Sequence, residues 1–428
     1  MLRLLGSVLG APIVVALLAV GPVLALTAQQ VAKLQPAELD PDDQFGGVVS
    51  IDGDTIVVSS VHDDDNGEDA GAAYVFVGQG GTWIQQAKLL AADGEAGDSF
   101  GGQVAISGDT IIAGAQGDDD NGDGAGAAYV FVRQGTTWTL EAKLISPSPI
   151  AGQRFGRVAL DGDTAFIGAA SFFTTVTGTY VFERENGVWS VTEFFTEGDF
   201  SDFFGSAVAV DGDTGAVGAV FDDDNGNDSG SAFLFVREFG DWTEEAMLLP
   251  TDGAAEDRFG GTVDVDGDLA LITARGDDDN GTDSGSAYVF ARRAGVWTET
   301  AKLLAFDGDA VDRFGDSAAL QADIVLIGAP GDDDLATDSG AAYLYADING
   351  AWVFQDKVHA DDGAPSDSFG FSADLGVDTA VIGANFDDDT GSVYVFELIG
   401  EPDVPATGSL GIVLLLLAML VAYSRMTW

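Results

Sequence analysis

The chain has 428 residues, of which 17 are Lys or Arg and 71 are Asp or Glu, so its formal net charge is −54. This charge excludes nucleic acid as a partner, because phosphate groups need a basic surface. Hydrophobic residues make up 46% of the chain, which predicts a packed core, and the absence of cysteine excludes disulfides, thiolate zinc sites and cysteine nucleophiles. Only His62 and His359 could serve histidine-based catalysis.

The N-terminal segment has the pattern of a secretory signal. Arg3 precedes an apolar stretch over residues 4–20, and Val23-x-Ala25 and Ala28 offer small-residue cleavage points. We therefore expect residues 1–28 to be a signal peptide. The alternative is a buried first helix.

The dipeptide Phe-Gly recurs seven times between the two ends of the chain. Six of the seven units hold the same order of four short segments rich in Val, Ile, Thr and aromatic residues, which in the second unit are residues 103–106, 110–115, 128–132 and 138–144. Four strands per unit with Gly and Asp turns are typical of propeller blades. The repeats predict an all-β, seven-bladed β-propeller over residues 29–399, with Phe-Gly at Phe45, Phe100, Phe155, Phe204, Phe259, Phe314 and Phe369.

The two ends of the repeat region predict how the ring closes. The seventh unit stops after its third strand, residues 393–396, and has no fourth strand. Residues 29–34 precede the first Phe-Gly as a fourth strand does elsewhere, with Lys33 in the place of Lys88. We expect the N-terminal strand to complete the last blade, which leaves no free sheet edge and favours a monomer.

A family resemblance follows from these motifs. Phe-Gly, an alternating strand, Gly-Ala as in Gly114-Ala115 or Gly-Ala-Pro as in 328–330, and Tyr-Val-Phe are similar to the FG-GAP repeat of the integrin α-subunit propeller. The resemblance implies a seven-bladed propeller. The calcium loop of that family lies between strands 1 and 2, where this chain has only a short turn such as 52–55, so the family's calcium residues do not carry over.

Six units carry three consecutive aspartates between their second and third strands, on the face that we expect to be acidic. Close carboxylates repel one another, and hard cations such as calcium take several oxygen ligands. A solvated or halophilic surface and a specific cationic ligand are the alternatives. The candidate calcium ligands are Asp63, Asp65, Asp118, Asp120, Asp123, Asp222, Asp224, Asp277, Asp279, Asp332, Asp334, Asp387 and Asp389.

The C-terminal segment resembles a bacterial sorting tail. Residues 400–409 form a linker in which 404–408, Val-Pro-Ala-Thr-Gly, are close to the sortase LPxTG pattern, and the arrangement is also similar to IPTL-CTERM and PEP-CTERM tails. Residues 410–428 hold an apolar run and Arg425, which we expect to contact the membrane. The resemblance implies secretion and anchoring at the surface or outer envelope of a bacterium.

These features together predict a cell-surface binding or adhesion module for a surface protein or a polysaccharide. A structural envelope component is an alternative, and a carboxylate-based glycosidase or lyase is a further one, although we expect no enzyme because the near-identical blades mark no catalytic centre. The third unit departs from the repeat at Phe172-Phe173, where we expect any unique ligand site. We interpret Arg275-Gly276-Asp277 as a chance tripeptide, and the Asp that stands two residues before the Phe in six units, as in Asp257, as a turn brace.

Overall fold

The computed structural model describes residues 26–171, 174 and 176–400. Residues 26–399 form one compact unit. The expected signal peptide up to residue 25, Phe172, Phe173 and the expected tail from residue 401 lie outside the described residues.

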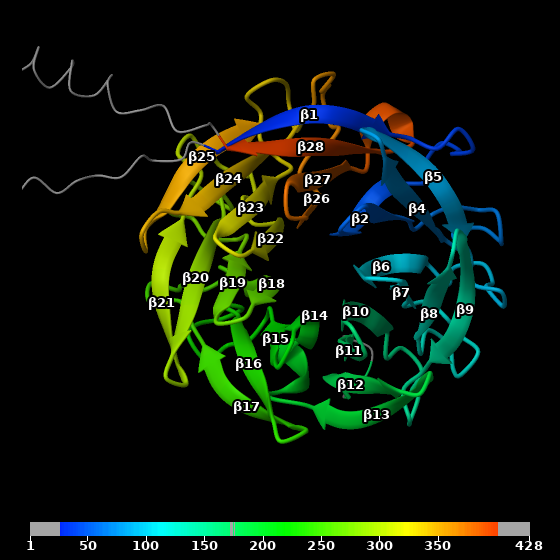
Figure 1. Cartoon of the computed structure of the whole chain (residues 1–428). Helices are drawn as coiled ribbons and strands as arrows, with labels where there is room; N and C mark the ends of the chain where they lie inside the picture. The colour runs from blue at the N-terminus through cyan, green and yellow to red at the C-terminus, as the bar shows by residue number, and fades with distance from the viewer. Residues whose placement is uncertain (1–25, 172–173, 175, 401–428) are drawn as a thin grey trace, which may run out of the picture. The chain divides into compact units, whose positions relative to one another are not determined.

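The described residues form seven four-stranded antiparallel sheets arranged as a ring (Figure 1). This confirms the all-β, seven-bladed propeller. We number the blades 1 to 7 by their Phe-Gly. The innermost strands are β2 (Phe45–Asp52), β6 (Phe100–Ser107), β10 (Phe155–Asp161), β14 (Phe204–Asp211), β18 (Phe259–Asp266), β22 (Ser317–Gln321) and β26 (Ser372–Leu375).

The second and third strands of each blade form its middle. The second strands are β3 (Thr55–Ser60), β7 (Thr110–Ala115), β11 (Thr164–Ala169), β15 (Thr214–Ala219), β19 (Leu269–Ala274), β23 (Ile324–Ala329) and β27 (Thr379–Ala384). The third strands are β4 (Ala72–Gln79), β8 (Ala127–Gln134), β12 (Gly178–Glu185), β16 (Ser231–Glu238), β20 (Ser286–Arg293), β24 (Ala341–Asp347) and β28 (Ser392–Gly400).

The outer strands form the rim of the ring. They are β5 (Thr82–Leu89), β9 (Thr137–Leu144), β13 (Val188–Phe195), β17 (Asp241–Leu248), β21 (Val296–Leu303), β25 (Trp352–Val358) and, for blade 7, β1 (Leu26–Leu34). Two 3-10 turns, η1 (Phe200–Asp202) and η2 (Asp387–Asp389), lie in the loops.

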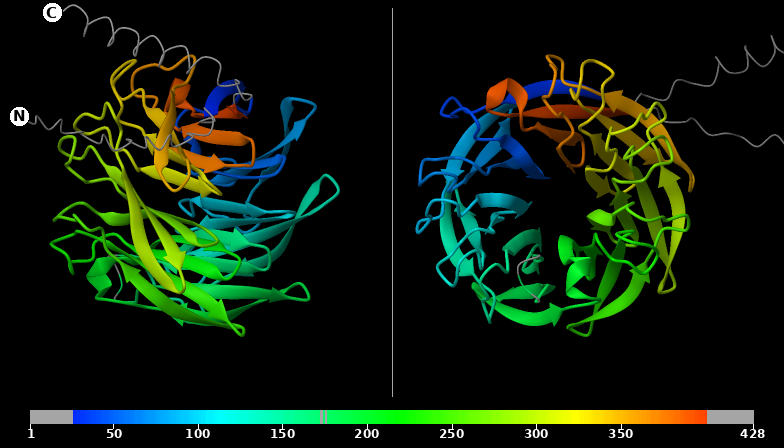
Figure 2. Two further views of the ribbon diagram at one scale, coloured as in Figure 1. Left: turned by 60° about the vertical axis from the view of Figure 1, so that its left-hand side comes forward. Right: turned by 180° about the vertical axis from the view of Figure 1, so that it is seen from behind.

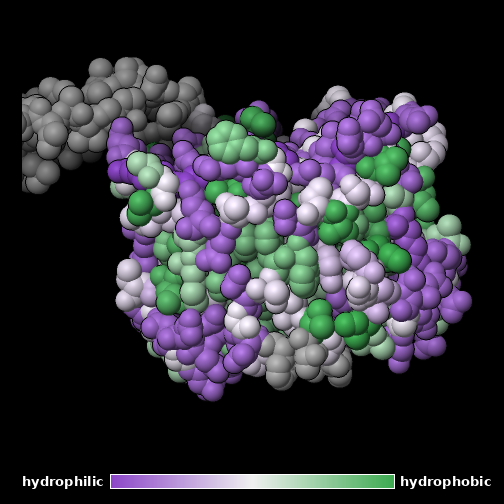
Figure 3. Space-filling model, turned by 90° about the horizontal axis from the view of Figure 1, so that it is seen from below, coloured by the Kyte–Doolittle hydropathy of each residue, from purple (hydrophilic) through white to green (hydrophobic). Residues whose placement is uncertain are grey.

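Burial follows the position of a strand in its blade. All six residues of β3 and of β7 are buried, because both faces of a blade pack against neighbouring blades. The outer strand β13 alternates between exposed and half-buried residues, as expected for a sheet edge with one wet side. Figure 3 views the rim from the side of β13 and β17, and hydrophobic residues lie across its middle between hydrophilic margins (Figure 3).

The Phe-Gly dipeptide joins each blade to the one before it. Phe45 is fully buried and packs edge-on against Tyr74, with 5.5 Å between the ring centroids. Gly46 has a φ of +92°, and a Cβ there would lie 2.6 Å from the carbonyl oxygen of Ser392 in blade 7. Only glycine permits this approach without strain. The glycine of the repeat is therefore required by the contact between blades.

The ring closes through the N-terminal strand. The last sheet has the order β1-β28-β27-β26, so β1 is the outer strand of blade 7, as we predicted (Figure 1). The strand begins at Leu26, so it includes three residues that we expected in the signal peptide, and cleavage after Ala25 stays a prediction.

The two faces of the ring carry different connections. The loops between second and third strands and the links from a fourth strand to the next blade share one face, here called the loop face; for example, Gly97 N–H donates to Glu68 and Phe100 N–H to Ala70. The short hairpins make up the opposite turn face. The right-hand view of Figure 2 looks onto the loop face. No helix among the described residues has the length and apolar character to cross a membrane.

Candidate functional site

The aspartate loops hold an internal counter-charge in five blades. In blade 5 the Lys302 ammonium, from β21, lies 2.8 Å from Asp252, 2.8 Å from Asp277 and 2.7 Å from Asp279. The Tyr288 hydroxyl lies within hydrogen-bond distance of two carboxylates, Asp277 at 3.1 Å and Asp252 at 3.0 Å. The first aspartate of the triplet is buried and the third is exposed, so one lysine bridges a buried and a solvated carboxylate.

The same Lys–Asp–Tyr cluster recurs in blades 1, 2, 6 and 7. In each, one lysine contacts the first aspartate of the loop at 2.6 to 2.8 Å and lies over the ring of the tyrosine. The members are Lys88, Asp63, Asp65 and Tyr74; Lys143, Asp118, Asp120, Asp93 and Tyr129; Lys357, Asp332, Asp334, Asp307 and Tyr343; and Lys33, Asp387, Asp388, Asp362 and Tyr394.

The cluster changes the protonation equilibria of its members. Burial alone would lower the pKa of Lys302, but hydrogen bonds to Asp252, Asp277 and Asp279 outweigh it and hold the pKa above its usual range. Burial alone would raise the pKa of Asp252, but the hydrogen bonds from Lys302 and Tyr288 outweigh it and hold the pKa below its ordinary value. The lysine is therefore charged at any physiological pH.

A bound calcium ion would have to compete with this lysine. In five blades the ammonium contacts the first aspartate of the loop, and in four of them the third as well, so the residues proposed as ligands do not fit a metal ion there. Within the part of the chain that the structure describes, no three His, Cys, Asp or Glu side chains are grouped so that they could hold a metal. Calcium binding stays a prediction.

Blade 4 is the exception among the loops with an aspartate triplet. Met247 replaces the lysine and Phe233 replaces the tyrosine at the same paired positions of β16 and β17. Asp222 is buried and accepts hydrogen bonds from the Ser231 hydroxyl at 2.8 Å and from Asp224 N–H at 2.8 Å. Asp222 and Asp224 therefore have no lysine between them, and calcium is best tested at this pair.

The remaining predicted ligands contribute little besides backbone contacts. Asp123 and Asp389 are exposed, and each accepts, through its backbone carbonyl, a hydrogen bond at 2.7 Å, from Gly152 N–H and Asp42 N–H respectively. The tripeptide at residues 275–277 is not presented as a unit, since Asp277 is buried in its cluster and Arg275 pairs with Asp316 at 3.0 Å.

The aspartate two residues before Phe-Gly braces its turn in six of the seven blades, as we predicted. The side chain of Asp257 accepts a hydrogen bond from Ala254 N–H at 2.7 Å. Burial raises the pKa of Asp257 to about 6, against that hydrogen bond, and the Asp277 carboxylate adds to the rise. The same bond from the residue three positions earlier is made by Asp43, Asp98, Asp202, Asp312 and Asp367.

Arginines on the turn face belong to contacts between blades. In blade 5 the Arg292 guanidinium lies 5.2 Å from the centre of the Trp297 ring, 2.7 Å from Asp268 and 3.1 Å from Glu245 of blade 4. Blades 2, 3 and 4 repeat the Arg–Trp stack and the Arg–Asp pair with Arg133, Arg184 and Arg237. These residues are occupied in holding the ring together.

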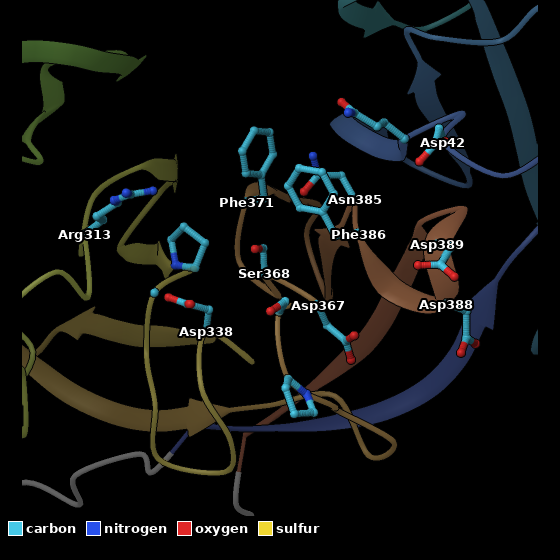
Figure 4. A pocket seen from close by; sticks show the side chains of 15 residues that line it. Asp42, Arg313, Asp338, Asp367, Ser368, Phe371, Asn385, Phe386, Asp388 and Asp389 are labelled. Carbon is cyan, nitrogen blue, oxygen red and sulfur yellow. The ribbon is translucent and has the colours of Figure 1, made fainter.

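A cavity of about 700 Å³ lies on the loop face, where blades 6, 7 and 1 meet; we call it the blade 6–7–1 pocket. Phe371, Phe386 and Asn385 lie between Arg313 on one side and Asp388 and Asp389 on the other (Figure 4). Phe371 and Phe386 are 38% and 48% exposed.

The sequence held a signal for this pocket that the repeat-based prediction missed. Phe371 directly follows the Phe-Gly of the seventh unit, at a place where blades 1, 2 and 5 have a second glycine. Phe386 directly precedes the aspartate triplet of that unit, at a place where blades 2, 5 and 6 have glycine. We expected a unique site in the third unit, at Phe172-Phe173, which lies outside the described residues. That expectation stays a prediction.

Comparison with known proteins agrees with the repeat seen in the sequence. The model of the FG-GAP repeat family matches residues 28–76, 83–131, 196–235, 242–290, 297–345 and 352–396. No curated protein matches the sequence. A crystal structure of a protein from Lactobacillus plantarum is similar at 16% identity and a TM-score of 0.46, over 76% of this chain and 85% of that one. No conclusion is drawn from a similarity at this level.

The family matches leave out residues 132–195, the stretch that includes the third Phe-Gly and the loop without aspartates. The matches nevertheless cover more than half of the chain. Each match after the first ends within the third strand of a blade. The first match begins in β1, the strand that closes the ring. The chain belongs to the FG-GAP repeat family.

Proposed function

We propose that the chain is an exported binding module of the bacterial cell surface, whose ligand docks in the blade 6–7–1 pocket. The observation that carries this proposal is the pair of exposed phenylalanines, Phe371 and Phe386, that line the blade 6–7–1 pocket. An exposed aromatic side chain among polar groups offers a flat apolar surface together with hydrogen-bonding partners, which suits the rings of a sugar or the side chains of a protein.

The rest of the proposal concerns location and charge. The signal-like N-terminus and the sorting-like tail support export and anchoring at the surface or outer envelope. The exposed aspartates of the loops support an acidic loop face, which would keep the molecule soluble and select against anionic surfaces away from the pocket. Calcium at Asp222 and Asp224 would be part of this face.

A binding screen tests the proposal. The full chain, kept in a non-ionic detergent because residues 410–423 are apolar, would be applied to an array of neutral and acidic polysaccharide fragments. We expect binding that is lost in the Phe371→Ser, Phe386→Ser double variant. The matched control is Phe239→Ser, because Phe239 is fully exposed in the hairpin between β16 and β17.

The array also separates the alternatives. No signal for any fragment would exclude a polysaccharide ligand. Equal binding by the wild type and the double variant would place the ligand elsewhere on the ring and would contradict the proposed site.

A further inference from the structure

Most basic residues in the described part of the chain serve contacts between strands and blades. Ten of them contact carboxylates at salt-bridge distance. Arg258 and Arg313 are not among these ten, and each stands directly before the Phe-Gly motif of its blade, blade 5 or blade 6. The role of these two arginines is therefore not explained by the ion pairs that hold the ring together.

Arg258 and Arg313 line one small cavity together with Arg275. Its volume is about 310 Å³, and the residues that line it are Arg258, Arg275, Arg313 and Asp283. All four are charged and three are arginines, in a chain whose net charge is −54. We call this the arginine cavity.

The arginine cavity leaves hydrogen-bonding capacity unused. The Nε of Arg258 is buried and has no hydrogen-bond partner among the described residues. Arg313 forms no side-chain hydrogen bond or ion pair within that part of the chain, and it also borders the blade 6–7–1 pocket (Figure 4). A buried N–H without an acceptor costs free energy, on the order of 1–3 kcal/mol, unless another molecule supplies one.

The nearby carboxylates do not cancel the positive charge. Asp316 forms an ion pair with Arg275 at 3.0 Å. Asp283 is the one carboxylate among the residues that line the arginine cavity. Arg275 also lines the central channel, about 380 Å³ in volume, in which Arg157 lies. Burial lowers the pKa of Arg157 to about 10, and the positive charge of Arg154 adds to this effect.

From this cavity we infer that the chain binds an oxyanion, a carboxylate, sulfate or phosphate group, between Arg258, Arg275 and Arg313. The guanidinium group presents paired N–H donors in a plane that match such groups. The cavity admits either a free ion or the acidic group of a sugar whose rings continue into the blade 6–7–1 pocket, which Arg313 borders. This inference rests on the proposed function and names the chemical class of its ligand.

Calorimetric titration of the full chain in non-ionic detergent tests the inference. The probes are sodium sulfate, sodium phosphate, the uronate trisaccharide tri-galacturonate and the neutral trisaccharide maltotriose, all at one ionic strength. We expect binding of at least one of the first three and none of maltotriose. Binding of the free ions supports a small-ion site, and binding of tri-galacturonate alone supports an acidic glycan.

The variants show whether the arginines are responsible. Arg258→Gln with Arg313→Gln should weaken binding at least about tenfold, which corresponds to about 1.4 kcal/mol. Arg293→Gln removes one positive charge from an exposed site at the end of β20 and should leave binding unchanged. If the double variant melts early, Arg313→Gln alone serves, because Arg313 is exposed and its loss does not disturb the core.

Two results would overturn the inference: no binding of any of the three anions, or equal binding by the wild type and the arginine variant. Either one leaves the proposed function standing if the array signal still depends on Phe371 and Phe386.

Discussion

Lys302 shows how one residue on an outer strand balances a loop of aspartates. Its ammonium contacts the buried carboxylate of Asp277 and the exposed carboxylate of Asp279. The hydroxyl of Tyr288, on the neighbouring strand β20, also contacts Asp277. Removing one partner of a buried ion pair is costly because the other charge stays buried. The lysine is thus a structural counter-ion for its own blade.

We predict that Lys302→Met lowers the free energy of unfolding by about 3 kcal/mol, because the side chain of Asp277 is only 5% exposed. Urea denaturation of the variant and the wild type measures the difference. Arg293→Gln, which removes an exposed charge from the same blade, is the control and should change little. An unchanged midpoint for Lys302→Met would show that Asp277 needs no counter-charge.

The turn brace Asp257 predicts a dependence on pH. Burial raises its pKa from 3.8 to about 6, so the folded state binds more protons than the unfolded state between these values. The contribution of Asp257 to stability therefore falls as pH rises from about 4 to about 6, and its penalty is fully present above pH 6.

Asp257→Asn removes this charge and keeps an oxygen that accepts the Ala254 N–H. We expect the variant to be more stable than the wild type at about pH 7.5 by about 1 kcal/mol, allowing for screening, and to match it at about pH 4. Thermal unfolding at both values measures this. The idea fails if the difference between the two proteins is the same at both pH values.

At the scale of the element, the repeat made the blades predictable. The strands, the closure by β1 and the turn braces all follow from local patterns that recur in nearly every unit. The Lys–Asp–Tyr cluster is also visible in the sequence, because blade 4 lacks both the lysine and the tyrosine and has Met247 and Phe233 in their places. We predicted a role for the aspartates alone, because the lysine that contacts them lies far from them in the sequence.

The blade 6–7–1 pocket could not be derived in the same way. Arg313, Phe371 and Asp42 come from three blades and meet only when the ring closes. The sequence marks some of these positions as departures from the repeat, but the direction of each side chain depends on how neighbouring blades pack. The cavity is therefore a product of tertiary structure.

Blade 4 offers a direct test of calcium. Met247→Lys should supply the missing ammonium to Asp222 and Asp224, and raise the unfolding midpoint in the absence of metal. We expect millimolar calcium to raise the midpoint of the wild type and not that of the variant, since a ligand that binds only the folded state stabilises it. Magnesium and monovalent salt are the controls. An equal calcium effect on both proteins would place the ion outside this pair.

The closing strand makes a second prediction at this scale. A chain that begins at Gln35 lacks β1, so the edge of β28 is left open. Asp362 and Asp387 also lose their ion-pair partner, Lys33. We expect a lower unfolding midpoint and self-association, because an open edge pairs with other chains. Size-exclusion chromatography and thermal unfolding measure these effects, with Lys33→Met as the control that loses the charge but keeps the strand. A monomer of unchanged stability would show that β1 is dispensable.

For the whole molecule, the distribution of charge matters more than its sum. Most of the basic residues in the ring hold loops and blades together. Arg258 and Arg313 instead meet at one cavity, which Arg275, the ion-pair partner of Asp316, also lines. At physiological salt, charges are screened beyond about 8 Å, so a local group of arginines can attract an anion despite a net charge of −54. We therefore propose that the ligand binds on the loop face over blades 5, 6, 7 and 1.

Hydrogen exchange of the full chain, with and without the fragment that binds best on the array, tests that placement most directly. We predict slower exchange in residues 361–371 and 385–390 on the loop face, and no change in the hairpins of the turn face. Protection confined to the turn face, or spread evenly over all seven blades, would contradict it.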